Sequence, residues 1–144
     1  VTDVRNFGAI VRTAECSGIH CIVIQNSGSA PVNGDTIKTS AGAVFNIPIC
    51  KVAHLKDAIF LIKQHKIKIF GATEKAKQNI YKSSLKHSLA VVFGSEGKGL
   101  SNSTIKLCDE LIKIPLIGKI DSLNVSVTVG AVLFEILRQK EYNS

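Results

Sequence analysis

Residues 114–137, IPLIGKIDSLNVSVTVGAVLFEIL, decide the fold of this 144-residue chain. A short apolar run ends at Pro115 and Gly118, a polar turn follows at residues 121–124, and a long apolar segment completes the stretch. That segment is too short and too polar for a membrane span, which needs about 20 predominantly apolar residues. Its apolar residues are not confined to one stripe of a helix, so a helix here must be covered on nearly all sides. We expect a sheet on one face and a second copy of the chain on the other, with a ligand at the polar turn.

The composition is typical of a one-domain globular protein with a basic surface. Hydrophobic residues make up 45% and charged residues 20% of the sequence, which allows a sizeable core. The formal net charge of +7 favours a polyanionic partner, nucleic acid before membrane, although a merely solvated basic surface fits the charge as well. The sequence has no visible repeat, linker, signal peptide or transmembrane segment, so we expect a single cytoplasmic domain over residues 1–144.

The cysteines and histidines do not show the spacing of a metal site. Cys16, Cys21, Cys50 and Cys108 lack C-x-x-C pairing and have apolar sequence neighbours, so we expect buried free thiols in a reducing cytosol. The four histidines lack metal-ligand spacing and are expected at the surface. No metal is therefore predicted.

Helix and strand signals alternate along the chain. The predicted helices before the final apolar segment cover about residues 6–17, 36–43, 54–65 and 101–107. The predicted strands cover residues 20–24, 47–52, 66–73, 88–94 and 110–116. Residues 74–86 are polar and predict a surface connection. The alternation predicts an α/β domain with a mainly parallel sheet and helices on both faces. Ligands bind such sheets beyond the carboxyl ends of the strands, here the loops after Thr73, Phe93 and Leu116.

The first predicted helix has Asn6 as its N-cap and Gly18 as its stop. Its buried face is expected to hold Phe7, Ile10, Val11 and Ala14. Gly8 and Arg12 are four residues apart and stack on another face. Gly8 would then clear space beside the Arg12 guanidinium, although an ordinary surface arginine beside an incidental glycine is the alternative.

A glycine-rich loop, GSEGKG at residues 94–99, follows the strongest predicted strand. It matches neither the G-x-G-x-x-G dinucleotide motif nor the P-loop, so dinucleotide and NTP binding lose their main support. Glycines let backbone groups approach a ligand closely. A plain tight turn is an equally good interpretation of this loop.

Three segments of the sequence together match a known family: residues 6–13 (NFGAIVRT), residues 92–101 (VFGSEGKGLS) and residues 114–127 (IPLIGKIDSLNVSV). In this order they resemble the three motifs of the SpoU (TrmH-like) branch of the SPOUT RNA ribose 2′-O-methyltransferases. The resemblance covers essentially the whole chain. It implies a deep trefoil knot at the carboxyl end, which is an exception to the rule against threading. It also implies S-adenosylmethionine as cofactor, a homodimer through the C-terminal helix, and methylation of a ribose 2′-hydroxyl of tRNA or rRNA.

The resemblance implies roles for individual residues. Arg12 matches the arginine placed at the target ribose and held by Asn6, and Glu96 matches an acid that supports the site. Ser122 and Asn124 match a polar pair near the reacting groups. The cofactor-binding positions match Thr73, Gly94, Gly99, Ile114, Leu116, Leu123 and Asn124. Because a guanidinium has a pKa above about 12, we expect Arg12 to orient the hydroxyl and stabilise the developing alkoxide.

Two alternatives stay open: a non-catalytic RNA-binding module with the same fold, and a methyltransferase that acts on a base. The pairing of Arg12 with Asn6 argues against the second, because it belongs to the ribose branch. Relatives usually have an apolar strand before the segment that matches residues 1–6, and many have an amino-terminal RNA-binding domain; we expect this chain to lack both. The basic residues expected along the RNA backbone are Arg5, Lys38, Lys75, Lys77, Lys82, Lys86 and Lys98.

Overall fold

Strands and helices alternate along residues 1–142, the part of the chain that this computed structural model describes. The helices are α1 Val4–Cys16, α2 Gly34–Thr39, α3 Leu55–Gln64, α4 Asn102–Leu107 and α5 Val125–Leu137. The strands are β1 Ile22–Gln25, β2 Ile49–Val52, β3 Lys68–Ala72, β4 Leu89–Phe93 and β5 Glu110–Ile112. Short helical turns are η1 Ala43–Phe45, η2 Ile80–Lys82 and η3 Arg138–Tyr142. The predicted order of elements is confirmed, with ends that shift by a few residues.

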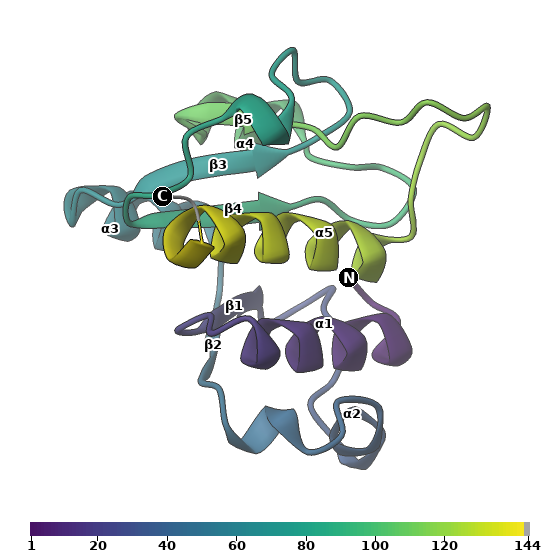
Figure 1. The fold of residues 1–144 in the computed structure, drawn as a ribbon. Coiled ribbons are helices and arrows are strands. Elements are labelled where there is room, and N and C mark those ends of the chain that lie inside the picture. The colour runs from purple at the N-terminus through teal and green to yellow at the C-terminus, as the bar shows by residue number, and fades with distance from the viewer. Residues whose placement is uncertain (143–144) are drawn as a thin grey trace.

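The strands form two parallel sheets, not the single sheet that the sequence predicts. β1 pairs with β2, with Ile22 opposite Ile49. The second sheet has the order β4-β3-β5, and Phe70 of β3 lies opposite Val91 and Glu110. Within residues 1–142 no ladder joins β1 to β4, so each of these strands has an unpaired edge (Figure 1). Because every ladder is parallel, β3, β4 and β5 end at the same edge of their sheet.

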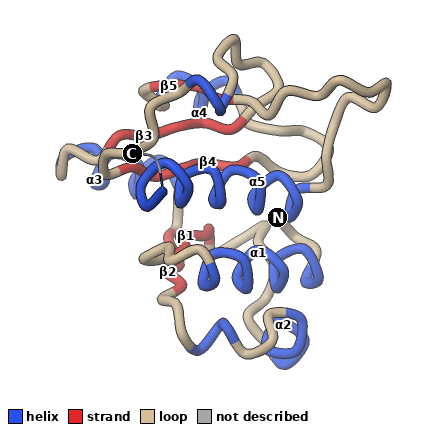
Figure 2. The backbone as a smooth tube through the Cα atoms, in the orientation of Figure 1, coloured by secondary structure: helices blue, strands red, loops and turns tan. Residues whose placement is uncertain are grey.

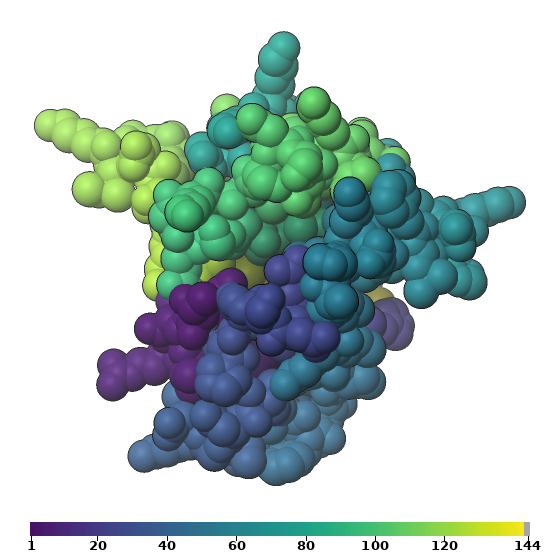
Figure 3. All heavy atoms as spheres, turned by 180° about the vertical axis from the view of Figure 1, so that it is seen from behind, coloured from purple at the N-terminus to yellow at the C-terminus, as the bar shows by residue number. Residues whose placement is uncertain are grey.

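Helices lie on both sides of the strands. Figures 1 and 2 show α1 and α5 side by side in front of the strands, with α3 and α4 behind them. Helix α3 contacts β1, β2 and β3 and therefore connects the two sheets. The view from behind shows the two halves of the sequence in different halves of the molecule, with the yellow of α5 visible between them (Figure 3). The most deeply buried large side chains include Val11, Phe70, Ile80, Ile112 and Val132.

Helix α1 begins earlier than predicted because Asp3, and not Asn6, is its N-cap. The Asp3 carboxylate accepts hydrogen bonds from the backbone N–H groups of Arg5 (2.8 Å) and Asn6 (3.0 Å). The prediction that Asn6 caps this helix is wrong, and its side chain has other partners. The expected buried face is confirmed for Phe7, Val11 and Ala14, whereas Ile10 is half-buried.

Gly8 makes room for Thr39 of α2 and not, as predicted, for Arg12. A β-carbon built on Gly8 would overlap Thr39 Oγ1 and lie 2.6 Å from Thr39 Cβ. The Thr39 hydroxyl donates to the carbonyl of Asp35 at 2.8 Å within α2, and lies 3.4 Å from the carbonyl of Val4 in α1. The close approach of α1 and α2 therefore requires glycine at position 8.

We expect Gly8→Ala to lower the free energy of unfolding by about 1–3 kcal/mol, the usual cost of extra carbon in a packed site. Alanine by itself would favour a helix by up to about 1 kcal/mol over glycine, so a loss must come from packing. Gly34→Ala is the matched control, because Gly34 is also helical and an added β-carbon there meets nothing within 4 Å. Urea unfolding followed by circular dichroism compares the variants. Equal stability would contradict the packing role of Gly8.

The cysteines are free thiols, as predicted, but the prediction that they are buried is wrong. Cys16, Cys21 and Cys50 are exposed and Cys108 is half-buried. Cys21 and Cys50 lie at the β1–β2 sheet, which has only two strands. Partial burial, the charge of the Cys50 thiolate and hydrogen bonding to Cys50 raise the pKa of Cys21. Burial is also the largest cause of the raised pKa of Cys108. In the described part of the chain, no three His, Cys, Asp or Glu side chains cluster as a metal site.

The connection between β3 and β4 is packed into the fold and is not the surface segment predicted from its polar composition. Ala76, Ile80 and Leu85 are buried. The Ile80 N–H donates to the carbonyl of Lys113 at 2.9 Å, and the Lys113 N–H donates to the carbonyl of Gln78 at 3.0 Å. The connection therefore runs beside the end of β5.

Helix α5 keeps one uncovered apolar stripe. Val129, Val132 and Ile136 are buried, and the helix packs against α1. Val127 and Phe134 are 54% and 47% exposed, and their seven-residue spacing places them on the same side of the helix. Within residues 1–142, none of the helices combines the length and the hydropathy that a bilayer-crossing segment requires.

Candidate functional site

A cavity of about 140 Å³ opens at the carboxyl ends of β3 and β5, where parallel sheets bind ligands. The ends of these strands, the loop before α5 and α5 itself form its walls. The predicted cofactor and motif-three residues that line it are Thr73, Ile114, Leu116, Ser122 and Leu123. Ligand pockets commonly hold about 300–1,000 Å³, so this cavity encloses only part of a nucleotide-sized ligand.

The two strands hold one wall of the cavity firmly and leave the opposite wall open. The Thr73 N–H donates to the carbonyl of Ile112 at 3.0 Å, which extends the β3–β5 ladder into the cavity wall. Leu116 and Leu123, in contrast, are exposed on the yellow-green loop that projects from the molecule before α5 (Figures 1 and 3). The predicted strand over residues 110–116 is too long: β5 stops at Ile112, opposite the last residue of β3, and the next N–H, that of Lys113, donates to the carbonyl of Gln78.

Hydrogen bonds join the three motif segments beside this cavity. Glu96 Oε1 accepts a long hydrogen bond from Asn6 Nδ2 at 3.5 Å, and Asn6 Oδ1 accepts from Asn124 Nδ2 at 3.2 Å. Asn124 Oδ1 in turn accepts from the Ser126 N–H at 2.9 Å, which makes Asn124 the N-cap of α5. The glycine loop, the first turn of α1 and the start of α5 are therefore linked side chain to side chain.

Arg12 lies outside this network. The side-chain hydrogen bonds of Asn6 go to Glu96 and Asn124, so the contact between Asn6 and Arg12 that the resemblance implies is not formed. Arg12 is exposed, does not line the cavity, and lies about 9 Å further along α1 than Asn6. Its neighbour Thr13 faces α5, because a β-carbon built on Gly130 would lie 3.7 Å from Thr13 Cγ2.

Gly94 and Gly99 lie on opposite sides of a tight turn. The Gly99 N–H donates to the carbonyl of Ser95 at 2.9 Å. A β-carbon on Gly94 would overlap the backbone at Gly99 and Leu100, whereas one on Gly99 would lie 3.9 Å from Glu74 Oε1 at the cavity rim. Neither glycine lines the cavity, but Gly99 lies near Glu74, which does, and Gly94 supports the turn from behind.

Three charged residues line the cavity: Glu74, Lys113 and Asp121. Asp121 belongs to the polar turn at which the sequence predicts a ligand, whereas Glu74 and Lys113 are not predicted. Glu74 follows the predicted strand end at Thr73, so the strand-end rule could have found it. Two carboxylates beside apolar walls suit a ligand that is cationic and partly apolar. S-adenosylmethionine, with its sulfonium and ammonium groups, has this chemistry.

Several known proteins are similar to this chain in sequence and in fold. Residues 1–134 match the model of the SpoU rRNA Methylase family. The 23S rRNA (guanosine-2'-O-)-methyltransferase RlmB of Yersinia pestis is 39% identical over 140 residues, which are 97% of this chain and 57% of that protein. RlmB of Escherichia coli K12 is 38% identical over 140 residues, 97% of this chain and 58% of that protein. The chain thus spans a little over half the length of these curated relatives.

Two solved structures have closely similar backbones. The SpoU methyltransferase AviRb from Streptomyces viridochromogenes, in complex with the cofactor AdoMet, has a TM-score of 0.87 at 26% identity, covering 96% of this chain and 56% of AviRb. The A. aeolicus TrmH/SpoU tRNA modifying enzyme has a TM-score of 0.86 at 27% identity, covering 96% of this chain and 71% of that enzyme. Because the family model matches residues 1–134 of the 144 residues, the chain belongs to the SpoU rRNA Methylase family.

Proposed function

We propose that the protein transfers the methyl group of S-adenosylmethionine to a ribose 2′-hydroxyl of rRNA. The observation that carries this proposal is the cavity at the ends of β3 and β5, lined by Thr73, Ile114 and Leu123 at positions matched to cofactor binding. The names of the curated relatives support a guanosine of 23S rRNA as the target. The four free thiols fit a reducing compartment, and we place the reaction in the cytoplasm.

The residues around the cavity fit this cofactor. When bound, S-adenosylmethionine supplies a methyl group on a positively charged sulfur. The Glu74 and Asp121 carboxylates attract that cation, and Leu116 and Leu123 cover its apolar parts. Alignment of the hydroxyl with the methyl group lowers the barrier by up to about 7–11 kcal/mol in favourable cases. In this proposal Gly99 lets the backbone approach at the rim, while Ser122 and Asn124 orient the reacting groups.

Arg12 is assigned to the cavity of a second subunit. It does not line the cavity of its own chain, and it extends from α1, which packs beside the exposed stripe of α5. There its guanidinium pairs with a phosphate next to the target ribose and stabilises the negative charge that develops on the 2′-oxygen as its proton passes to water. Asn6 and Glu96 act indirectly, because they hold the start of α1 against the start of α5.

The same stripe supports a homodimer through α5. Val127 and Phe134 present exposed apolar surface on one side of the helix, where a second copy would cover it. In a two-fold dimer the same patch meets itself, so one stripe suffices for both subunits.

The carboxyl end is proposed to form a deep trefoil knot, with the loop before α5 as one crossing. The backbone similarity to SpoU methyltransferases and the resemblance of residues 114–127 to the third motif support it. We also propose a single methyltransferase domain over residues 1–144, completed in the whole protein by a strand between β1 and β4. Their unpaired edges support that strand.

RNA is the proposed partner. The basic residues expected along its backbone are all exposed: Arg5, Lys38, Lys75, Lys77, Lys82, Lys86 and Lys98. Such contacts set the position of an RNA without reading its sequence.

Incubation of the complete protein with total RNA and methyl-labelled cofactor tests the function. Nuclease digestion and mass spectrometry should find the label on the ribose of a guanosine in large-subunit rRNA. A label on the base would establish the base-directed alternative and contradict the proposal. RNA binding without cofactor binding, measured by calorimetry, would favour the non-catalytic module.

A further inference from the structure

The turn η3, which directly follows α5, holds the connection between β3 and β4, and we propose that its residue Gln139 is a positioning residue for the cofactor cavity. Through this connection it fixes the point at which β5 leaves the sheet and becomes cavity wall. The inference rests on the proposed function of the cavity and adds a residue distant from the three motif segments.

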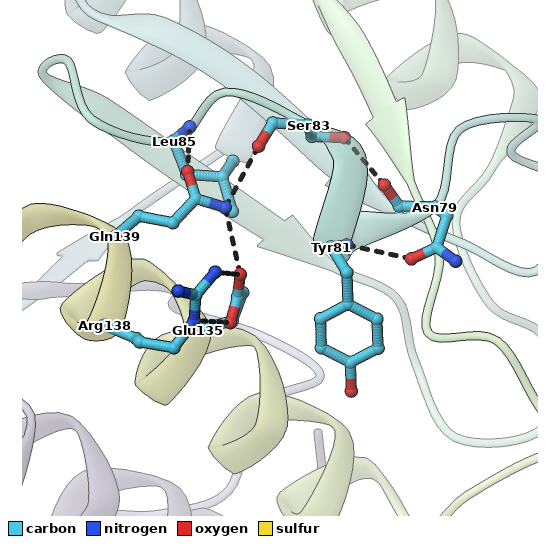
Figure 4. Close-up of polar contacts among 7 residues, drawn as sticks. All are labelled: Asn79, Tyr81, Ser83, Leu85, Glu135, Arg138 and Gln139. Atoms are coloured by element: carbon cyan, nitrogen blue, oxygen red, sulfur yellow. Dashed lines mark hydrogen bonds and ion pairs between the residues drawn. The ribbon is translucent and has the colours of Figure 1, made fainter. Parts of the chain in front are cut away.

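Gln139 binds the backbone of the connection with both ends of its amide (Figure 4). Its side-chain oxygen accepts from the Leu85 N–H at 2.8 Å, and its Nε2 donates to the carbonyl of Ser83 at 3.0 Å. The residue is only 5% exposed. Since Ser83 and Leu85 are buried too, their backbone groups have little access to water as a substitute partner.

An ion pair between the buried Glu135 and the exposed Arg138 lies next to the Gln139 amide. Gln139 Nε2 also donates to Glu135 Oε1 at 3.0 Å, and a carboxylate only accepts hydrogen bonds, so the amide nitrogen must face it. Arg138 holds Glu135 with two hydrogen bonds, Nε to Oε2 at 2.9 Å and Nη2 to Oε1 at 2.7 Å. The bonds from Arg138 and then Gln139 lower the pKa of Glu135, although burial opposes them. The carboxylate therefore stays charged and favours the same amide orientation that the Ser83 carbonyl and the Leu85 N–H already require.

The connection passes this restraint on to the cavity wall. The Ser83 hydroxyl donates to the carbonyl of Asn79 at 3.1 Å, and these two residues flank the turn η2. On the other side of that turn, Ile80 and Gln78 exchange backbone hydrogen bonds of 2.9 and 3.0 Å with Lys113. Lys113 lines the cavity, so a continuous series of contacts leads from Gln139 to it.

The restraint matters because β5 is short. It has three residues, Glu110–Ile112, and β3 holds it from one side only. Beyond Ile112 the chain is held by β3 through the Thr73 N–H and by the connection through Lys113. Removal of the Gln139 amide leaves the Ser83 carbonyl and the Leu85 N–H unpaired, so the connection must move, and Lys113 with it.

Gln139→Leu tests the inference, with Arg138→Gln as its matched control. Arg138→Gln breaks the ion pair with Glu135 but leaves the bonds from Gln139 to the connection in place. We expect Gln139→Leu to raise the Kd for S-adenosylmethionine about tenfold, and Arg138→Gln to change it less than about twofold. Hydrogen exchange should speed up at the Ile80 and Lys113 amides in Gln139→Leu alone. Calorimetry measures the Kd, and urea midpoints compare the stability of the variants.

An unchanged Kd with unchanged exchange in Gln139→Leu would overturn the inference. Equal weakening in both variants would also overturn it, because general destabilisation would then be the cause. If Gln139→Leu does not fold, Gln139→Met keeps the length of the side chain and removes both hydrogen-bonding groups, and it gives the same two readings. Failure of the wild-type protein to bind S-adenosylmethionine would instead remove the proposed function, and the exchange measurement would then decide the role of Gln139.

Discussion

Replacing Arg12 with alanine is expected to lower the rate of methyl transfer by about 10²–10³-fold, the usual effect of removing one donor to a developing oxyanion. Binding of S-adenosylmethionine should not change, because Arg12 is assigned to the target ribose and its phosphate and not to the cofactor. Arg12→Lys keeps the charge and loses the two-pronged donor geometry, so it should recover only part of the rate. Single-turnover methylation and calorimetry separate the two effects. Near-normal turnover of Arg12→Lys would contradict the bidentate role.

Arg5→Ala is the matched control for Arg12→Ala. Arg5 is also an exposed arginine on α1, and its seven-residue spacing from Arg12 places it on the same side of the helix. As a phosphate contact it should weaken RNA binding without lowering the maximal rate. A similar loss of maximal rate in Arg5→Ala would show that charge on this side of α1, and not Arg12 itself, supports the reaction.

Mixed dimers test whether Arg12 acts on the partner's cavity. Arg12→Ala subunits are combined with Leu123→Arg subunits, in which a positive side chain opposes the cationic cofactor. If Arg12 acts across the dimer, each mixed dimer contains one complete site, and an equal mixture should recover about one quarter of wild-type activity. If Arg12 serves its own cavity, no complete site forms and the mixture stays inactive.

The features that the sequence predicted correctly depend on residues close together in the chain. Ser101 caps α4 through its hydroxyl, as a serine before a short helical pattern implies. The strand ending near Thr73 leads into the cavity, because strand direction alone places that end at the ligand edge. Both features can be predicted without knowing which distant residues pack against them.

The features that the sequence missed depend on partners distant in the chain. Gly8 faces Thr39, which lies thirty-one positions further along, so helical spacing pointed to the wrong neighbour, Arg12. Asn6 bonds Asn124 and Glu96 instead of Arg12 for the same reason. Family motifs mark which residues are important, but only the fold determines which of them pair. The buried apolar residues of the β3–β4 connection follow no period of 2 or 3.6, so pattern reading could not place them.

Phe134→Glu is expected to convert the proposed dimer to a monomer and to remove nearly all methyl transfer. Phe134 and Val127 form the exposed stripe of α5, and an aromatic side chain at the centre of an interface typically contributes 2 kcal/mol or more, as an order of magnitude. In the dimer interface, a glutamate at this position would also bury an unpaired charge, which strongly disfavours association. Together these effects should raise the dimer Kd by at least about 10³-fold. Analytical ultracentrifugation over a range of concentrations measures this change.

The control for that variant is Phe60→Glu. Phe60 is 49% exposed, almost as much as Phe134 at 47%, but it lies on α3, on the other side of the strands. The same charge placed there should leave the dimer and the reaction intact. A Phe134→Glu protein that stays dimeric would contradict the interface on α5. A Phe134→Glu monomer with wild-type turnover would contradict the assignment of Arg12 to the partner's cavity, because one chain would then hold every group that the reaction needs.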